Sequence, residues 1–245
     1  MQPHKIVSEQ EWLAARKELL TKEKELTRAR DQLSAERHAL PWVKVEKKYL
    51  FDTPDGSRSL AELFNGKSQL LVYHFMLGPG WKEGCPSCSF LADHFDGMLP
   101  HLAARDVTFT AISRAPLAEI EAYKRRMGWR FPWASSFANE FNFDYHVSFP
   151  SDQTSSEVDY NYEMQDVGSD EMPGLSAFYQ GAAGIFHTYS AYARGLDSLV
   201  GTYNFLDVAP KGRDEDNLPW TMAWVRRHDE YDHAPKSKAE RSSAA

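Results

Sequence analysis

The two cysteines of this 245-residue chain are the residues whose types and spacing could do chemistry. Cys85 and Cys88 stand three positions apart, and the sequence holds no other cysteine. Before them, the apolar residues 70–77 have the length of a buried strand; after them, apolar residues recur at helical spacing over 90–99. The order is therefore strand, Gly-Pro-Gly loop, Cys-x-x-Cys, helix, with Pro86 at the first helical position, where proline is favoured.

This placement predicts a reactive thiol at Cys85. Unpaired N–H groups at the beginning of a helix favour thiolate over thiol. In Cys-x-x-Cys motifs the pKa of the first thiol falls to between roughly 3.5 and 7.5. Cys88, one helical turn further on, is then close enough to attack a mixed disulfide at Cys85. We therefore predict a dithiol–disulfide site in which Cys85 attacks and Cys88 resolves.

Other chemistries could use the same residues. Cys85, Cys88, His94 and His101 together supply four sulfur and nitrogen ligands for a metal ion, although their spacing differs from that of zinc fingers. A structural disulfide is disfavoured in a reducing compartment. Two inert buried thiols are a further alternative, because free cysteines are often buried. We favour redox catalysis and keep a non-catalytic binding protein or redox sensor, with or without a metal, as the alternative function.

Composition excludes several classes of protein. The hydrophobic share of 42% and the aromatic share of 13% are those of a globular protein with a core. A net charge of −7 gives no basic surface for nucleic acid. The N-terminus has no signal-like apolar region, and no apolar run approaches the roughly 20 residues of a membrane helix. We expect a cytoplasmic protein without a membrane partner, and without a nucleotide cofactor because no Gly-x-Gly-x-x-Gly occurs.

Residues 1–41 are predicted to form a helical arm. Ser8 and Glu11 have the spacing of a capping box, and Pro41 ends the helix. Apolar residues recur at every seventh position, namely Trp12, Leu19, Leu26, Leu33 and Leu40. So thin a stripe buries little surface within one chain. We therefore expect the arm to pack on a partner subunit and give a homodimer; the alternative is a helix that lies along its own domain.

Residues 42–233 are predicted to form one α/β domain. Its expected elements are strands at 42–46, 70–77, 107–113 and 131–137, hairpins at 49–56 and 175–189, and helices from 86, 116 and 196, with an amphipathic piece at 220–231. Strand, helix, strand and helix in succession indicate a parallel pair with a right-handed crossover. Residues 138–172 are predicted to form a long surface insertion, which is a candidate lid over the cysteines. Residues 234–245 are expected to be a disordered tail.

This order of elements resembles the thioredoxin fold over residues 42–209. The resemblance implies a central mixed sheet flanked by helices, here with a long N-terminal helix and an insertion before the C-terminal hairpin. In that fold a cis proline before the third core strand packs against the redox cysteines. Pro173 stands at the matching place. The resemblance thus assigns Pro173 to shaping the groove where a substrate backbone docks; the alternative is an ordinary turn proline.

More closely, the chain resembles the thioredoxin-like family known as domain of unknown function 899 (DUF899), often labelled predicted dithiol–disulfide oxidoreductase. The motifs that carry this resemblance are 84–90 (GCPSCSF), 113–117 (SRAPL), 123–129 (YKRRMGW), 187–190 (HTYS) and 193–197 (ARGLD). Gly84 replaces the tryptophan of thioredoxin proper, and the Pro-Ser pair between the cysteines is closer to glutaredoxin. The Pro, Thr and Cys pattern of peroxiredoxins is absent. The implied substrate is a disulfide-containing protein or a low-molecular-weight thiol.

Further residues are candidates for shaping the site. Trp81 could form a wall beside the cysteines, or simply cover the core. Arg114 follows the end of a strand, where α/β sites collect, and could bind an anionic thiol or pair with an acid. Lys82 could stabilise the thiolate. Tyr160 and Tyr162 in the insertion could cap a pocket, with surface packing as the alternative.

Overall fold

The structure, a computed structural model, describes residues 4–150 and 157–231. It divides into two compact units, Met1–Trp42 and Val43–Ala245. The division falls next to the arm boundary expected after residue 41. The tail expected at 234–245 lies outside the described residues. Over the described part of the chain, no helix has both the length and the apolar character needed to cross a membrane.

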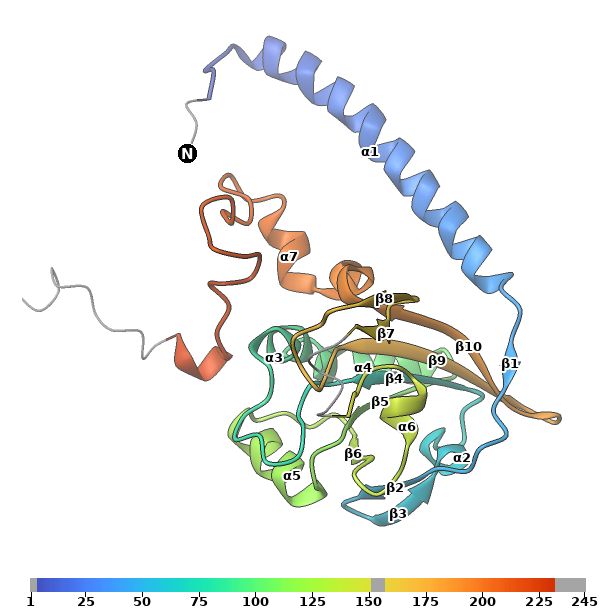
Figure 1. Cartoon of the computed structure of the whole chain (residues 1–245). Helices are drawn as coiled ribbons and strands as arrows, with labels where there is room; N and C mark the ends of the chain where they lie inside the picture. Colours follow the sequence, from blue (N-terminus) through green and yellow to red (C-terminus); the bar gives the residue numbers. More distant parts are fainter. Residues whose placement is uncertain (1–3, 151–156, 232–245) are drawn as a thin grey trace, which may run out of the picture. The chain divides into compact units, whose positions relative to one another are not determined.

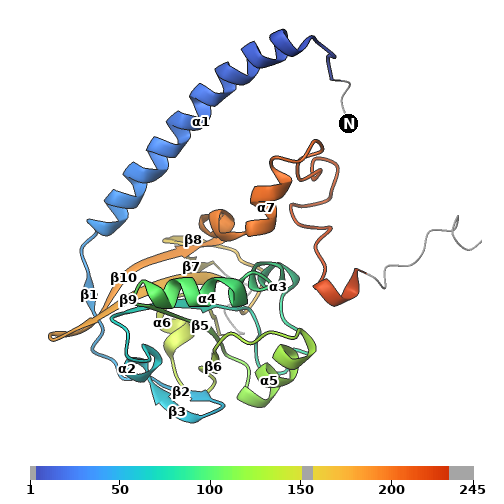
Figure 2. The same cartoon turned by 180° about the vertical axis from the view of Figure 1, so that it is seen from behind.

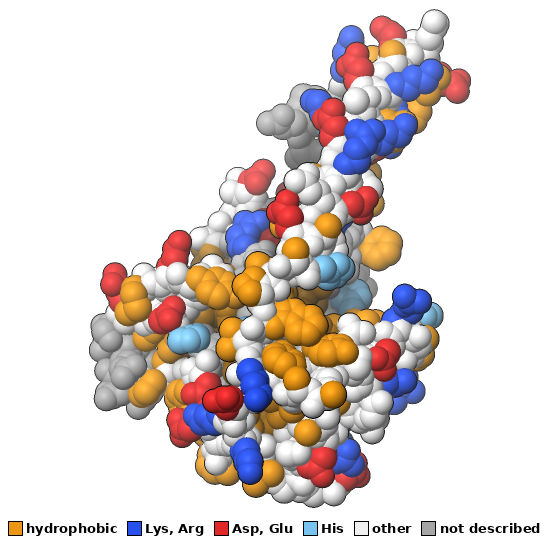
Figure 3. Space-filling view, turned by 90° about the vertical axis from the view of Figure 1, so that its right-hand side faces the viewer, with side chains coloured by type: hydrophobic (Ala, Val, Ile, Leu, Met, Phe, Trp, Pro, Cys, Tyr) orange, Lys and Arg blue, Asp and Glu red, His pale blue; other side chains and the backbone are white. Residues whose placement is uncertain are grey.

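The first unit is one long helix, α1 (Glu9–His38), drawn in blue in Figure 1. It begins with the predicted capping box, in which the Ser8 hydroxyl accepts from the Glu11 backbone N–H and the Glu11 carboxylate accepts from the Ser8 N–H. No residue of α1 is buried. Charged side chains of both signs cover much of its surface, with hydrophobic ones between them (Figure 3). The predicted helix is confirmed, and its apolar stripe has no cover within its own unit.

The second unit is built on an eight-stranded mixed sheet of order β1-β10-β9-β4-β5-β6-β2-β3. The strands of this sheet are β1 (Val43–Lys44), β2 (Leu50–Thr53), β3 (Gly56–Ser59), β4 (Gln69–His74), β5 (Val107–Ser113), β6 (Trp133–Ser135), β9 (Gly174–Gly181) and β10 (Gly184–Tyr192). A separate hairpin pairs β7 (Val158–Tyr160) with β8 (Glu163–Gln165). The helices are α2 (Leu60–Leu63), α3 (Pro86–Ala92), α4 (Phe95–Ala104), α5 (Leu117–Arg126), α6 (Phe141–Asp144), α7 (Gly201–Leu206) and the 3₁₀ helices η1 (Ala193–Leu199) and η2 (His228–Glu230).

The core of the sheet has the thioredoxin-like arrangement. The central strand β4 pairs in parallel with β5 and antiparallel with β9, and β9 forms a hairpin with β10. The chain leaves β4 through α3 and α4, returns in β5, continues through α5, and reaches the hairpin only after α6, β7 and β8. The predicted fold class is therefore confirmed, including the long N-terminal helix and the insertion before the C-terminal hairpin.

Alternating side chains of β4 serve the two faces of the sheet. Tyr73 belongs to the larger core cluster, with residues of α3, α4 and α5. Val72 on the opposite face belongs to a second cluster, with residues of α2 and α6. Figures 1 and 2 show the same division, since α6 stands in front of the sheet in the first view and α4 in the second. Burial of each large apolar side chain contributes about 1.5–3 kcal/mol, so both faces anchor the central strand.

Three predicted elements differ in the structure. The single cysteine helix is two helices, since α3 ends at Ala92. The carboxylate of the C-cap residue Asp93 accepts from the Trp129 indole N–H at 2.8 Å and lies 2.7 Å from His228 Nδ1. The insertion expected at the surface over 138–172 lies partly in the core, since its short helix α6 begins with Phe141, which is fully buried against Tyr49 and Phe51. The tail piece 220–231 is irregular apart from η2.

Candidate active site

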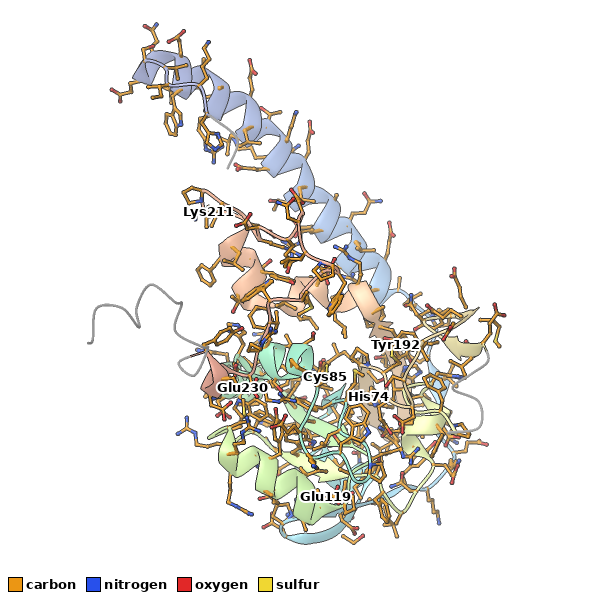
Figure 4. All side chains as sticks on the ribbon, turned by 60° about the vertical axis from the view of Figure 1, so that its left-hand side comes forward. His74, Cys85, Glu119, Tyr192, Lys211 and Glu230 are labelled. Atoms are coloured by element: carbon orange, nitrogen blue, oxygen red, sulfur yellow. The ribbon has the colours of Figure 1, made fainter. Side chains whose placement is uncertain are left out.

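The fold places Cys85 at the boundary between the loop after β4 and the beginning of α3. The Cys85 N–H donates to the Met76 carbonyl at 3.1 Å, which ties the loop back to the end of the strand. Cys85 is the N-cap residue and Pro86 is the first helical residue, as predicted. Figure 4 labels Cys85 at this position. Cys85 is half-buried, Cys88 is only 1% exposed, and the two free cysteines lie 4.0 Å apart.

The pKa values of the two thiols are shifted in opposite directions. The pKa of Cys85 is lowered from 9.0 to about 6, chiefly because the Cys88 thiol donates a hydrogen bond to its sulfur. Backbone N–H groups of Cys88 and Ser87 and the Ser87 hydroxyl lower this pKa further, while burial opposes them. The pKa of Cys88 is raised well above its ordinary value by burial and by the neighbouring Cys85 thiolate. Near neutral pH the site therefore holds one thiolate and one thiol.

Two tyrosines lie beside the buried thiol. The Tyr73 hydroxyl makes a hydrogen bond with the Cys88 side chain, and the Met76 N–H also donates to this sulfur. Both lower the pKa of Cys88 against the larger effect of burial. Tyr160 of β7 interacts electrostatically with Cys88 and with Tyr73. Sequence reasoning placed Tyr160 only over a pocket and missed Tyr73, although the alternation of β4 places Tyr73 on the face that carries α3.

Gly84 explains why tryptophan is absent before the first cysteine. A β-carbon built at Gly84 would lie 2.5 Å from Phe75 Cε1 and 2.7 Å from Tyr123 Cε1. Both aromatic rings belong to the buried core, so neither has room to withdraw. The backbone before Cys85 is thus pressed onto two aromatic rings. Only glycine fits this position without a shift of the core.

Trp81 and Arg114 have partners inside the protein. Trp81 is half-buried and packs, like Cys85, against the larger core cluster. Arg114 Nε lies 3.5 Å from Glu171 Oε1, and its guanidinium lies 4.4 Å from the centre of the Phe143 ring. The guanidinium is therefore engaged by an acid and an aromatic ring, which was the alternative to anion binding.

Glu171 is a buried carboxyl group that sequence reasoning missed. It is 1% exposed and accepts a hydrogen bond from the Ser148 hydroxyl at 2.6 Å. Burial raises its pKa to about 7, although Ser148 and Arg114 oppose the shift. A β-carbon built at Gly78, in the cysteine loop, would lie 3.2 Å from Glu171 Cγ. A carboxyl group that titrates near neutral pH thus lies against the loop that leads to Cys85.

Pro173 lies at the edge of the sheet where β4 ends, because the next residue, Gly174, pairs with His74. Its carbonyl accepts from the Tyr160 hydroxyl at 2.8 Å. The peptide bond before Pro173 is trans, and the described residues contain no cis peptide bond. This corrects the cis geometry that the resemblance implied. The Met172 N–H donates to the Val147 carbonyl at 2.8 Å, so hydrogen bonds to the insertion hold this segment on both sides of the proline bond.

The remaining candidates lie apart from the thiol pair or at the surface. The His94 ring contacts Thr202, with 2.8 Å between Nε2 and Oγ1. In residues 4–150 and 157–231, no three His, Cys, Asp or Glu side chains are grouped to hold a metal, so the four-ligand arrangement is not assembled. Tyr162 is 71% exposed and donates to the Ser190 carbonyl at 3.0 Å. Lys82 is exposed.

Comparison with known proteins identifies the family. The model of the family described as bacterial protein of unknown function (DUF899) matches residues 1–231, and the chain belongs to this family. The match includes the helical arm, the thioredoxin-like core and the irregular C-terminal segment. No curated protein matches the chain.

Among solved structures, the chain is similar to several peroxiredoxins. Peroxidoxin BcpB from Mycobacterium tuberculosis is 11% identical with a TM-score of 0.47, and the match covers 66% of this chain and 95% of that one. Peroxiredoxin Q from Xanthomonas campestris is 13% identical with a TM-score of 0.43, covering 68% and 96%. A mitochondrial 2-Cys peroxiredoxin from Plasmodium falciparum is 12% identical with a TM-score of 0.42, covering 67% and 92%. Similarity at this level assigns no activity, and the fold described above rests on the chain's own topology.

Proposed function

We propose that the protein is a thiol–disulfide oxidoreductase that uses Cys85 and Cys88 to reduce or exchange disulfides. The observation that carries this proposal is the unequal thiol pair at the beginning of α3. Cys85 is half-buried with its pKa lowered to about 6, and Cys88 is buried with its pKa raised. A nucleophilic thiolate beside a protonated resolving thiol is the arrangement that two-step disulfide exchange requires.

The reaction proceeds in two exchanges. The Cys85 thiolate attacks one sulfur of a substrate R–S–S–R′, which forms a Cys85–S–S–R bond and releases R′–S⁻. Cys88 gives its proton to the released thiolate or to water and attacks the Cys85 sulfur. This second exchange closes the Cys85–Cys88 disulfide and releases R–S⁻, which solvent protonates. The substrate gains two electrons, which the dithiol loses, and an external thiol or dithiol restores the reduced protein.

Disulfide-containing proteins and low-molecular-weight disulfides are the proposed substrates. Either class offers a disulfide sulfur that the half-buried Cys85 can attack, and the exchange needs no other functional group of the substrate. The proposed place of action is the cytoplasm, where thiol reductants keep such a dithiol reduced. Pro173, whose carbonyl is held by the Tyr160 hydroxyl, is proposed to shape the groove where the substrate docks beside the cysteines.

The test is a redox titration of the purified protein in glutathione buffers, with turnover of hydroxyethyl disulfide measured on the same samples. Wild type is expected to show one reversible two-electron transition, assigned by peptide mapping to a Cys85–Cys88 disulfide, and to reduce the substrate repeatedly. Cys85→Ser should lose turnover. Thiols that stay unreactive throughout the titration, or turnover that survives in Cys85→Ser, would contradict the proposal.

A further inference from the structure

The C-terminal segment 222–231 lies against the loop that carries Cys85. It follows the last helix of the thioredoxin-like core and is irregular apart from η2. Val225 is 3% exposed within the larger core cluster, and the Trp224 ring meets Phe90 of α3 edge-on at 5.5 Å. In Figure 4 the labels Cys85 and Glu230 mark the two segments. A part of the chain outside the core topology thus packs directly beside the thiol site.

Arg227 makes the decisive contacts of this segment. Its Nη2 and Nε donate to the Gly84 carbonyl oxygen at 2.8 and 3.2 Å, and Nε also donates to the Tyr123 hydroxyl at 3.2 Å. Its Nη1 pairs with carboxylates of Glu83 and Glu230, each at 3.0 Å. The Arg227 side chain is only 13% exposed. The carbonyl, hydroxyl and carboxylate oxygens around this guanidinium stabilise a charge that is largely removed from water.

A second line of hydrogen bonds runs from Arg227 to the other side of Cys85. The Tyr123 and Ser89 hydroxyl oxygens lie 2.8 Å apart, and the Ser89 hydroxyl donates to the Cys85 carbonyl at 2.9 Å. Because Ser89 gives its one proton to this carbonyl, Tyr123 is the donor to Ser89. The carbonyls of residues 84 and 85 are therefore both held by one network that begins at the guanidinium.

We infer that Arg227 is a positioning residue of the thiol site, which fixes the peptide groups on both sides of Cys85 and thereby the orientation of its sulfur. A carbonyl oxygen carries partial negative charge and raises the energy of a nearby thiolate. Bonds to Arg227 and Ser89 hold both oxygens in place, while the N–H groups of Ser87 and Cys88 face the sulfur. This inference rests on the proposed thiolate chemistry of Cys85.

The neighbouring ion pairs cannot replace Arg227 in this role. Arg126 of α5 lies 2.5 Å from Glu83 and 2.7 Å from Asp229, but all three side chains are about one-third exposed. Exposed pairs of this kind contribute little, because solvent screens the charges. The less exposed Arg227 is the group that contacts the cysteine loop itself.

The inference is tested by the pH dependence of Cys85 alkylation with iodoacetamide, measured by peptide mapping on the full chain. Arg227→Ala removes the guanidinium, and Arg227→Lys keeps a charge without the fork of donors. Tyr123→Phe removes the hydroxyl that links Arg227 to Ser89. The matched control is Arg226→Ala, because the Arg226 guanidinium bonds only to the Ala223 and Val225 carbonyls of its own segment among the contacts of the described residues.

Arg227→Ala, Arg227→Lys and Tyr123→Phe are expected to raise the alkylation midpoint by about one pH unit, which lowers the rate below the midpoint about tenfold. Arg226→Ala should titrate as wild type. Unchanged midpoints in both Arg227→Ala and Tyr123→Phe, a wild-type midpoint in Arg227→Lys, or an equal shift in Arg226→Ala would each overturn the inference. If Arg227→Ala does not fold, Tyr123→Phe decides. An ordinary midpoint in wild type itself would instead refute the proposed function.

Discussion

At the scale of single residues, Cys88 is harder to deprotonate than Cys85, because its thiol lies inside an aromatic core. It is 1% exposed, and burial raises its pKa. The Tyr73 hydroxyl is the side-chain group that lowers this pKa, besides the backbone N–H of Met76. Edge-on contacts with Phe75 at 6.1 Å and Phe95 at 5.2 Å hold the Tyr73 ring in place. The hydroxyl is therefore positioned to stabilise charge that develops on the Cys88 sulfur.

Tyr73→Phe is expected to slow the resolving step while leaving the first attack intact. A hydrogen bond to a charged group contributes about 1.5–3 kcal/mol, so decay of the mixed disulfide should slow by about tenfold or more. Stopped-flow mixing with a chromogenic disulfide separates the two steps. Tyr203→Phe is the control, since this tyrosine is equally buried in the same core cluster and its hydroxyl binds the Glu215 carboxylate instead of a cysteine. Equal decay rates in wild type and Tyr73→Phe would refute this role.

Gly84→Ala is expected to destabilise the protein by about 1–3 kcal/mol, because the added methyl group overpacks against the Phe75 and Tyr123 rings. Urea unfolding measures the change. Gly97→Ala in α4 is the matched control, since a β-carbon there meets nothing within 4 Å and alanine favours a helix. If the Gly84→Ala and Gly97→Ala variants unfold at the same urea concentration, the backbone at Gly84 does not lie as close to the Phe75 and Tyr123 rings as the structure shows.

Across the strands of the sheet, four polar side chains connect β4, β9 and β10. His74 Nε2 lies 2.8 Å from Ser176 Oγ, which lies 2.8 Å from Ser190 Oγ, and His187 Nε2 lies 2.7 Å from the same Ser190 oxygen. The His74 ring also stacks on Phe141 at 5.6 Å. His74 is 1% exposed, and burial lowers its pKa from 6.5 to about 3. The folded sheet therefore holds this imidazole neutral.

Stability is expected to fall as the pH drops from 6.5 toward 3, because the unfolded chain takes up a proton at His74 that the folded chain refuses. The full effect is on the order of 5 kcal/mol as an upper bound. Glu171, whose pKa burial raises, titrates in an overlapping range with the opposite sign. The measurement is therefore the pH dependence of urea unfolding for wild type minus that for His74→Phe.

In this difference, wild type should lose stability relative to His74→Phe with every step below pH 6.5. The exposed His101→Asn serves as control and should follow wild type. Parallel curves for wild type and His74→Phe would mean that His74 is protonated in the folded protein, contrary to its burial.

Local patterns in the sequence predicted the elements that carry the cysteines. The strands predicted at 70–77 and 107–113 correspond to β4 and β5, the capping box of Ser8 and Glu11 to the beginning of α1, and the hairpin predicted at 175–189 to β9 and β10. These features depend on neighbours along the chain. The roles of three residues were not predicted from the sequence, namely Tyr73, Glu171 and Arg227. These roles depend on partners far along the chain, such as Cys88 for Tyr73 and Gly84 for Arg227. A tyrosine in a strand or an arginine in an irregular tail carries no local mark of such a partner.

At the scale of the whole molecule, the exposed helix α1 bears on the oligomeric state. None of its residues is buried, and its stripe of Trp12, Leu19, Leu26 and Leu33 is 46–61% exposed. We propose that this stripe packs against the same stripe of a second copy. Light scattering should then find a dimer for wild type and a monomer for the double variant Leu19→Lys, Leu26→Lys. A monomeric wild type at high concentration would contradict the proposal.

The central claim is that Cys85 attacks the substrate disulfide and Cys88 resolves the mixed disulfide. The most direct test is to map which cysteine becomes glutathionylated when the protein is mixed with glutathione disulfide near neutral pH. The account predicts glutathione on Cys85 in Cys88→Ser, almost none on Cys88 in Cys85→Ser, and a closed Cys85–Cys88 disulfide in wild type. Capture on Cys88 in Cys85→Ser as fast as on Cys85 in Cys88→Ser would contradict the assignment of an attacking and a resolving thiol. Absence of capture in all three proteins would contradict redox chemistry at this site altogether.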